Sequence, residues 1–323
     1  MTKFFSKKNL FNLIFISILL LLITLILLMP TISINAFLQG IIIWSTKVMP
    51  ALLPFFILTK LLNYTTFTSF LGKVFSPITN KFYGVGGQAG YIYIISIISG
   101  YPVGAKITSE FYNAGILNSK QAKCITSFTS TSGPLFILGT IGIGLFNSAH
   151  LGIIILISHF LGAIINGFFY RYNDKIAIQS IQNTPQNVNI LSESMTNSIT
   201  SIMIVGGFIA IFYMLLQCLL SLNIFNIISF PLSKLGIHST ITEGIIAGIT
   251  EITTGAILLS KCNLPFNIIT PILSFLISFG GLSIHAQALC FLQEFKMKYS
   301  EFFVQKLTHA IISSLITTII VLI

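Results

Sequence analysis

A run of glycine and proline interrupts an apolar segment at Ser99-Gly100-Tyr101-Pro102-Val103-Gly104-Ala105-Lys106. Gly100, Pro102 and Gly104 oppose a continuous helix, and a helix that restarts near Pro102 has proline in its favoured first turn. The free N–H groups and positive dipole end of such a start suit a carboxylate. The residues expected to bind a substrate here are Gly100, Tyr101, Pro102, Gly104 and Lys106.

Lys106 has two interpretations. It lies about one turn beyond the helix restart, where its charge would add to the attraction for an anion. Alternatively, the helix is only kinked, and Lys106 lies at an interface and pairs with Glu110 four residues later.

A second interruption, Thr129-Ser130-Thr131-Ser132-Gly133-Pro134, breaks the apolar segment 123–146. Unwound backbone inside a membrane is tolerated only where protein or water covers it. Its hydroxyls and carbonyls are then available to a substrate or a coupling cation, whereas the alternative is close helix packing through small residues. The residues predicted to bind substrate are Thr129, Ser130, Thr131, Ser132 and Gly133, with Ser283 at the corresponding break of the second half.

Two acids and a histidine in the second half could handle a proton or a coupling ion. Glu243 and Glu251 are eight residues apart, about two helical turns, and an acid at membrane depth is usually functional. His285 follows the Gly280-Gly281 break and could titrate near neutral pH. The alternatives are an ion pair with Lys261, an interfacial Glu243 and a packing histidine.

The sequence argues against enzymatic, metal and nucleic-acid chemistry. It has no G-x-S-x-G or H-E-x-x-H run, and its histidines have no metal-ligand spacing. The scattered cysteines form no C-x-x-C pair, and we predict that they are free packing thiols. The net charge of +10 comes from lysines between apolar runs, where charge sets membrane topology, and not from a basic stripe. We therefore predict no enzymatic activity, no cofactor and no nucleic-acid partner.

The composition is that of a membrane protein. Only 7% of the 323 residues are charged, against about 25% in soluble domains. Lipid leaves backbone groups unsatisfied, so that spanning segments must be helices or closed barrels. Continuous apolar runs such as 10–29 favour helices. We therefore predict an all-α polytopic membrane protein.

Hydropathy and helix breakers divide the chain into four parts. Lys3, Lys7 and Lys8 before an apolar run are typical of a signal peptide, but 10–29 is longer than a signal core and is predicted to be a membrane helix. The stretch 63–86 is polar, and a short amphipathic piece is expected near 224–236. The predicted parts are an N-terminal membrane helix (1–36), a first repeat (37–170), a polar linker (171–195) and a second repeat (196–323).

An offset of 151 residues relates the two repeats. It places Gly104-Ala105 on Gly255-Ala256, Ser127-Phe128 on Ser278-Phe279, and Gly100 on Glu251. Most loop lysines fall on the cytoplasmic side if 88–110 and 239–260 are re-entrant hairpins that enter from opposite sides. We therefore predict two inverted repeats, each with one re-entrant hairpin and broken helices.

Three runs carry a resemblance to a known family. They are Ser99–Lys106, Thr126-Ser127-Phe128-Thr129-Ser130-Thr131-Ser132-Gly133-Pro134-Leu135-Phe136 and Pro50-Ala51-Leu52-Leu53-Pro54-Phe55-Phe56. In these runs the chain resembles the sporulation integral membrane protein YlbJ family, over roughly residues 37–323. That family belongs to the nucleoside-recognition Gate group, which is distantly similar to concentrative nucleoside transporters with two opposed re-entrant hairpins.

The resemblance implies a multi-pass protein of the outer forespore membrane, with its N-terminus in the cytoplasm. It implies transport of dipicolinate, a small aromatic dicarboxylate, toward the forespore, and a requirement for a normal spore cortex. The expected partners are an anionic substrate and the lipid bilayer, and contacts with other sporulation membrane proteins or a second copy of the chain stay open. The alternatives are a nucleoside or ion transporter of the Gate group and a non-transporting scaffold in sporulation.

Overall fold

The computed structural model describes residues 7–172, 189–234 and 238–323, and all regular structure in these residues is helical. The first half contains α1 (Lys7–Leu28), α2 (Pro30–Ile43), the π-helix η1 (Trp44–Val48), α3 (Met49–Asn63), α4 (Phe67–Tyr83), α5 (Gln88–Ser99), α6 (Val103–Asn113), α7 (Ser119–Thr129), the π-helix η2 (Leu135–Leu145) and α8 (Ala149–Phe169). The second half contains α9 (Ile190–Ser221), α10 (Ile224–Ser233), α11 (Ser239–Thr250), α12 (Ile252–Ser260), α13 (Phe266–Phe279), α14 (Gly281–Leu292), the short 3-10 helix η3 (Gln293–Phe295) and α15 (Tyr299–Leu322).

Several of these helices can cross a bilayer. In the described part of the chain, four are long and apolar enough, and a bent pair raises the number to five. The four are Ala149–Phe169, Ile190–Ser221, Phe266–Phe295 and Tyr299–Leu322. About 20 helical residues span a hydrocarbon core, so the chain is a polytopic integral membrane protein, as its composition predicts.

The first helix ends where the predicted membrane helix 10–29 ends. Leu19–Leu28 and Pro30–Val48 meet at an angle of 112°, so the break falls at Met29. Pro30 takes the first position of α2, where its missing N–H is not needed. From there α2, η1 and α3 follow one another as far as Asn63. The linker predicted for 171–195 lies largely outside the described residues.

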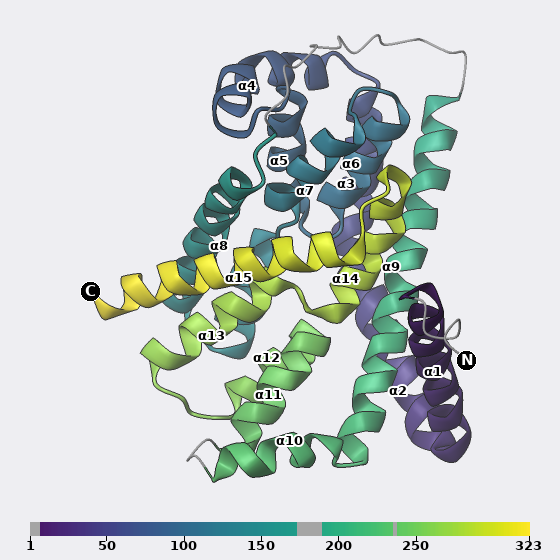
Figure 1. The fold of residues 1–323 in the computed structure, drawn as a ribbon, viewed down its shortest axis with the longest axis vertical. Coiled ribbons are helices and arrows are strands. Elements are labelled where there is room, and N and C mark those ends of the chain that lie inside the picture. The colour runs from purple at the N-terminus through teal and green to yellow at the C-terminus, as the bar shows by residue number, and fades with distance from the viewer. Residues whose placement is uncertain (1–6, 173–188, 235–237) are drawn as a thin grey trace.

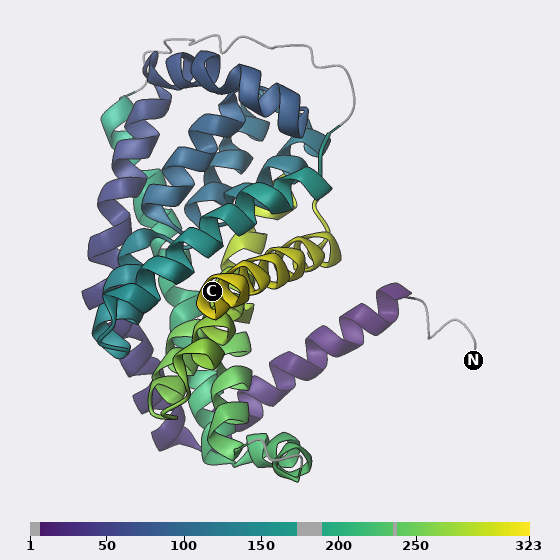
Figure 2. The ribbon, with the colours of Figure 1, turned by 90° about the vertical axis from the view of Figure 1, so that its left-hand side faces the viewer.

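The stretch 63–86, predicted only as polar, contains the helix α4. The helix has an exposed apolar stripe that includes Phe70, Val74 and Ile78, spaced four residues apart, while Thr79 and Tyr83 are buried. Such amphipathic helices lie in the membrane interface. The expected amphipathic piece near 224–236 is α10, and the two helices lie at opposite ends of the molecule in both views (Figures 1 and 2).

Two short helix pairs form antiparallel hairpins. A Cβ on Gly104 of α6 would lie 2.8 Å from the Ser96 hydroxyl of α5, and the Tyr91 and Phe111 rings of the same pair stack at 5.8 Å. In the second half, a Cβ on Gly244 of α11 would meet the Leu259 side chain of α12. The four helices have 9 to 12 residues each, which at 1.5 Å per residue is too short to span a bilayer.

The helices of the two halves recur in the same order. The offset of 151 residues places α5 (88–99) on α11 (239–250) end to end, and it places α8 near α15. Packing between the halves is also reciprocal, because α6 packs on α14 while α12 packs on η2, and α7 packs on α15 while α13 packs on α8. In Figure 1 the α5–α6 hairpin lies toward one end and the α11–α12 hairpin toward the other, with α15 between them.

A close seam joins α2 of the first half to α9 of the second. A Cβ on Gly40 would lie 2.6 Å from the Cα atom of Ala210, so the two backbones are nearly in contact. One turn further along, the Trp44 indole packs over Gly206 and donates a hydrogen bond to the Ile202 carbonyl at 3.1 Å. Small residues thus allow two long membrane helices to pack closely, as is common in membranes.

Candidate functional site

The turn of the α5–α6 hairpin packs against the break between α7 and η2. Gly100 forms this turn with φ 77° and ψ −168°, a conformation that is nearly restricted to glycine. A Cβ on Gly100 would lie 2.6 Å from the Gly133 nitrogen, and one on Gly104 would overlap the Thr129 carbonyl oxygen. The two polar runs that the sequence analysis singles out are therefore in direct contact.

Hydroxyl groups also link the first hairpin to the break by hydrogen bonds. The Ser96 hydroxyl donates to the Thr129 carbonyl oxygen and lies 3.0 Å from the Thr131 hydroxyl. Ser130 and Ser132 are buried beside them. The predicted site residues of the first half thus form one buried polar cluster, here called the first turn site: 99–104 and 129–133.

Lys306 of α15 enters the first turn site from the second half. Its side chain is 2% exposed. Its amino group donates to the Tyr101 hydroxyl, to the Ser130 carbonyl at 2.8 Å and toward Nδ1 of His309 at 3.3 Å. Tyr101 in turn donates to the Ser278 carbonyl at 3.3 Å. One amino group therefore joins the hairpin turn, the α7 break and the last helix.

Two buried histidines connect this amino group to the break. His159 Nε2 accepts a hydrogen bond from the Ser132 N–H at 2.8 Å, so Nδ1 carries the proton of the neutral ring and donates to the Ser278 hydroxyl at 2.7 Å. His309 accepts from Lys306 through Nδ1, and its Nε2–H donates to the His159 carbonyl at 2.9 Å. The network thus fixes the tautomer of each ring.

Lys106 lies in the first turn of α6, and its side chain is buried. It is 6% exposed, and its amino group lies 4.4 Å from the centre of the Phe56 ring, a cation–π contact. Glu110 lies 3.6 Å from the amino group of Lys60 on α3. The alternative of an interfacial Lys106 is therefore wrong, because the side chain is buried. The contact of Lys106 with a substrate stays a prediction.

The second hairpin turns at Glu251, the position that the offset relates to Gly100. Glu251 caps α12, because its carboxylate accepts from the N–H groups of Thr253 at 2.9 Å and Thr254 at 2.8 Å, and from the Thr254 hydroxyl at 2.7 Å. The predicted alternative was a pair with Lys261, and these contacts engage both carboxylate oxygens instead. Glu243 is half-buried on α11.

The break at Gly280-Gly281 packs on this second turn. A Cβ on Gly281 would lie 3.1 Å from the Gly248 carbonyl oxygen and 3.4 Å from the Ile252 nitrogen. His285 is buried and lies 2.9 Å from the Phe279 carbonyl oxygen and 3.4 Å from the Tyr299 hydroxyl. Ser283 accepts from Gln287 at 3.3 Å. These predicted residues thus lie beside the second break, outside the Lys306 network.

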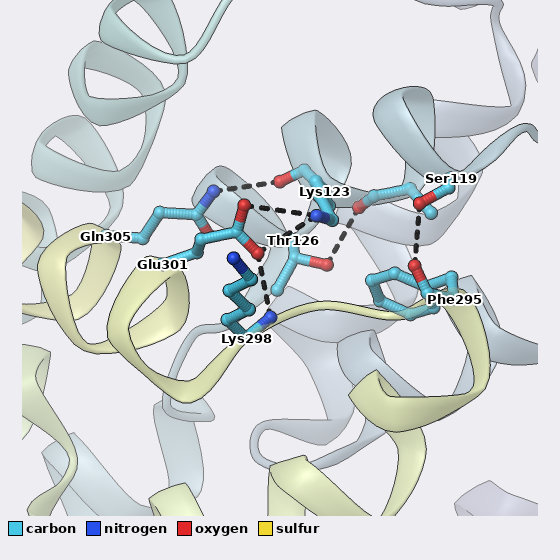
Figure 3. A network of polar contacts seen from close by, with 8 residues as sticks. Ser119, Lys123, Thr126, Phe295, Lys298, Glu301 and Gln305 are labelled. Atoms are coloured by element: carbon cyan, nitrogen blue, oxygen red, sulfur yellow. Dashed lines mark hydrogen bonds and ion pairs between the residues drawn. The ribbon is translucent and has the colours of Figure 1, made fainter. Parts of the chain in front are cut away.

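A second polar network holds α7 to α15 farther from the turn (Figure 3). Lys123 pairs with both carboxylate oxygens of Glu301 at 2.9 and 3.1 Å, and Gln305 donates to the Lys123 carbonyl at 2.9 Å. Ser119 donates to the Phe295 carbonyl at 2.6 Å. Lys123 and Glu301 are 27% and 41% exposed. This pair links α7 to the first turn of α15.

Sequence reasoning missed Lys306, His159 and His309. Lys306 was not among the predicted site residues, and it lies about two turns inside α15, which begins at Tyr299. The spacing Lys306-x-x-His309, which places two polar side chains on one face of an apolar helix, could have indicated an inward face. His159 and His309 are far apart in the sequence, but in the fold their ring centres are 4.8 Å apart.

Metal and cysteine chemistry receive no support from the described residues. No group of three histidine, cysteine, aspartate or glutamate residues lies close enough to hold a metal ion there. Cys124, Cys218, Cys262 and Cys290 are free thiols, two of them buried.

Comparison with known proteins bears on this same part of the chain. Residues 45–149, which include the first turn site, match the Gate family, described as nucleoside recognition. Over this segment the chain is thus similar to the Gate family. Over 309 residues it is 29% identical to the Sporulation integral membrane protein YlbJ of Bacillus subtilis (strain 168), a match that covers 87% of this chain and 76% of that protein. No solved structure matches.

These matches confirm the resemblance expected from the sequence. The Gate match begins near Trp44 and ends at Ala149, so it covers α3 to η2 and stops where α8 starts. The similarity to YlbJ continues through the second half and places the chain beside an integral membrane protein of sporulation. The two names describe nucleoside recognition and an integral membrane protein of sporulation, and neither is the name of an enzyme.

Proposed function

We propose that this protein transports a small organic anion across a membrane, and that the anion is dipicolinate moved toward the forespore and needed for the spore cortex. The observation that carries the proposal is the meeting of two helix breaks with two hairpin turns inside the molecule: Gly100 against Gly133, and Gly281 against the turn at Glu251. Broken helices at a buried crossing are how secondary transporters expose backbone groups to a substrate.

The proposed membrane arrangement is a pair of inverted repeats with re-entrant hairpins. Support comes from the equal order of helices, the reciprocal packing of α6 on α14 and α12 on η2, and the hairpin lengths, which are too short to span. In this arrangement the N-terminus is cytoplasmic and the two turns approach each other from opposite sides. The membrane we assign is the outer forespore membrane, on the similarity to YlbJ.

In this proposal the first turn site binds substrate and the second turn handles the coupling ion. The proposed substrate contacts come from 129–133 and from Gly100, Tyr101, Pro102, Gly104, Lys106 and Ser283. Glu251 is the proposed proton or cation carrier, assisted by Glu243 and His285. Because the Glu251 carboxylate also caps α12, a proton that reached it would weaken the cap, so protonation and movement of the second turn would be linked.

Nucleoside transport is the second candidate, because the Gate match is described as nucleoside recognition. A nucleoside carries no carboxylate and needs no buried cation. The composition of the first turn site, with Lys306 and Lys106 both buried near it, favours the anion.

The test is uptake by the purified protein in liposomes. Labelled dipicolinate and labelled uridine are offered with and without a proton or sodium gradient, to wild type and to Glu251→Gln. We expect saturable dipicolinate uptake that a gradient drives and Glu251→Gln loses. Uptake of uridine alone would replace the substrate, and uptake of neither by well-folded protein would favour a scaffold in a sporulation complex.

A further inference from the structure

The two hairpin turns differ at the positions that the offset of 151 residues relates. At the second turn, Glu251 supplies its own carboxylate to two N–H groups at the start of α12. At the first turn the related residue is Gly100, and α6 starts after Pro102 with no side-chain cap. The Val103 N–H donates to the Gly100 carbonyl at 3.1 Å, and without a side-chain cap the next N–H groups of α6 stay available to an anion. The chain therefore provides an anion at one turn and none at the other.

The amino group of a buried lysine, Lys306, lies at the turn that has no anion of its own. The three contacts of the Lys306 amino group are the Tyr101 hydroxyl, the Ser130 carbonyl and a histidine nitrogen, all neutral acceptors. In the described residues, ion pairs are found at Lys60–Glu110 and Lys123–Glu301, and no carboxylate lies within 4 Å of Lys306. A buried charge normally has a charged partner.

Buried hydroxyls at the same place also lack partners. The Ser130 and Ser99 hydroxyl oxygens make no hydrogen bond to any described residue. Ser99 ends α5 directly before the turn, and the Ser130 carbonyl binds Lys306. Most buried hydroxyls are hydrogen-bonded, so the unpaired hydroxyls of Ser99 before the turn and Ser130 at the break are two donors that a polar ligand would engage.

We propose that the first turn binds a carboxylate of the transported anion between Lys306 and the uncapped start of α6, in the role that the Glu251 carboxylate fills at the second turn. This inference rests on the proposed function and names the substrate group and its cationic partner. The ammonium group exchanges one neutral acceptor for the carboxylate, and the Ser99 and Ser130 hydroxyls donate to it. His159 and His309 are positioning residues, because they hold Lys306 and the α7 break in place.

The test is equilibrium binding of labelled dipicolinate to the purified protein in detergent. Lys306→Met removes the amino group and keeps an unbranched chain of similar length, but it leaves the Tyr101, Ser130 and His309 acceptors without this donor, so the stability of the variant is measured together with binding. Lys306→Gln is the second variant. Lys123→Met, which breaks the exposed pair with Glu301 on the same helix interface, is the matched control. Size-exclusion elution and circular dichroism report folding.

We expect both Lys306 variants to bind dipicolinate about tenfold to a hundredfold more weakly than wild type, the range expected for a lost hydrogen bond to a charged group. Lys123→Met should bind as wild type does. Wild-type binding that both Lys306 variants retain would overturn this inference and leave the proposed function intact. A folded wild type that binds uridine, or nothing, would overturn the proposed function itself and this inference with it.

Discussion

The two hairpins turn at related places in the chain, but they use opposite chemistry. The first turn has a glycine in a conformation closed to other residues and an uncapped helix start, with Lys306 against it. The second has Glu251, whose carboxylate closes the start of α12 with three hydrogen bonds. At the second turn, the Glu251 side chain binds the N–H groups at the start of α12. At the first turn, the start of α6 has no side-chain cap, and the Ser99 and Ser130 hydroxyls have no partner among the described residues.

This difference suggests a division of labour within a symmetric scaffold. Reciprocal packing between the halves keeps the two hairpins in similar settings, so the few residues at each turn decide what each binds. At the second turn, the carboxylate of the chain itself occupies the helix start. In the proposed function, the first turn takes its carboxylate from the transported anion. Three substitutions test whether the two turns differ in this way.

The largest effect is expected for Gly100→Ala. A residue with a side chain that adopts the backbone conformation of Gly100 is destabilised by roughly 1–3 kcal/mol. The new Cβ would also lie 2.6 Å from the Gly133 nitrogen. We expect loss of uptake and a clearly lower melting temperature. The matched control is Gly115→Ala, where φ is also positive, at 72°, but no atom lies within 4 Å. An active Gly100→Ala would show that contact between turn and break is not needed.

An intermediate effect is expected for Glu251→Ala. Removing a capping side chain destabilises a protein by about 1 kcal/mol, and here the start of α12 loses its carboxylate. We expect a modest fall in the free energy of unfolding together with loss of gradient-driven uptake, measured by denaturation in detergent and by liposome assay. Glu243→Ala, on the neighbouring α11, serves as a comparison that leaves the cap intact. Unchanged stability would mean that the second turn does not depend on its carboxylate.

The smallest effect is expected for Lys123→Met. Exposed ion pairs contribute about 0.2–1 kcal/mol, and both Lys123 and Glu301 are partly exposed. Thermal unfolding should shift slightly and dipicolinate uptake should not change. A large loss of uptake would mean that the network of Figure 3 sets the position of Lys306 along α15, which would extend the site to the end of that helix.

The helix breaks were the most predictable part of this molecule. Gly100, Pro102 and Gly280-Gly281 disrupt helices for local reasons, so their places follow from the sequence alone. The offset that relates the halves likewise predicted the α11–α12 hairpin from the α5–α6 hairpin. The helix α4 was missed within 63–86 because its polar residues hide an apolar stripe that is visible only at helical spacing.

The central lysine was not predictable in the same way. Lys306 meets Tyr101 and Ser130, which lie 205 and 176 residues away in the chain. No local pattern records such a contact, and a lysine near the start of an apolar helix is more often an interfacial anchor. The sequence predicted only one of the two roles of Glu251. An acid in an apolar segment indicated a function, but the cap on α12 depends on the backbone geometry of the turn.

The seam between α2 and α9 has a consequence for biosynthesis. Gly40 and Ala210 are nearly in backbone contact, yet 170 residues separate them, so at about 5–20 residues per second Ala210 is synthesised roughly 10–30 s after Gly40. During that interval the face of α2 that will receive α9 has only lipid or another protein to contact. Insertion factors that shield this face would therefore act on the first half of the nascent chain, before the second half exists.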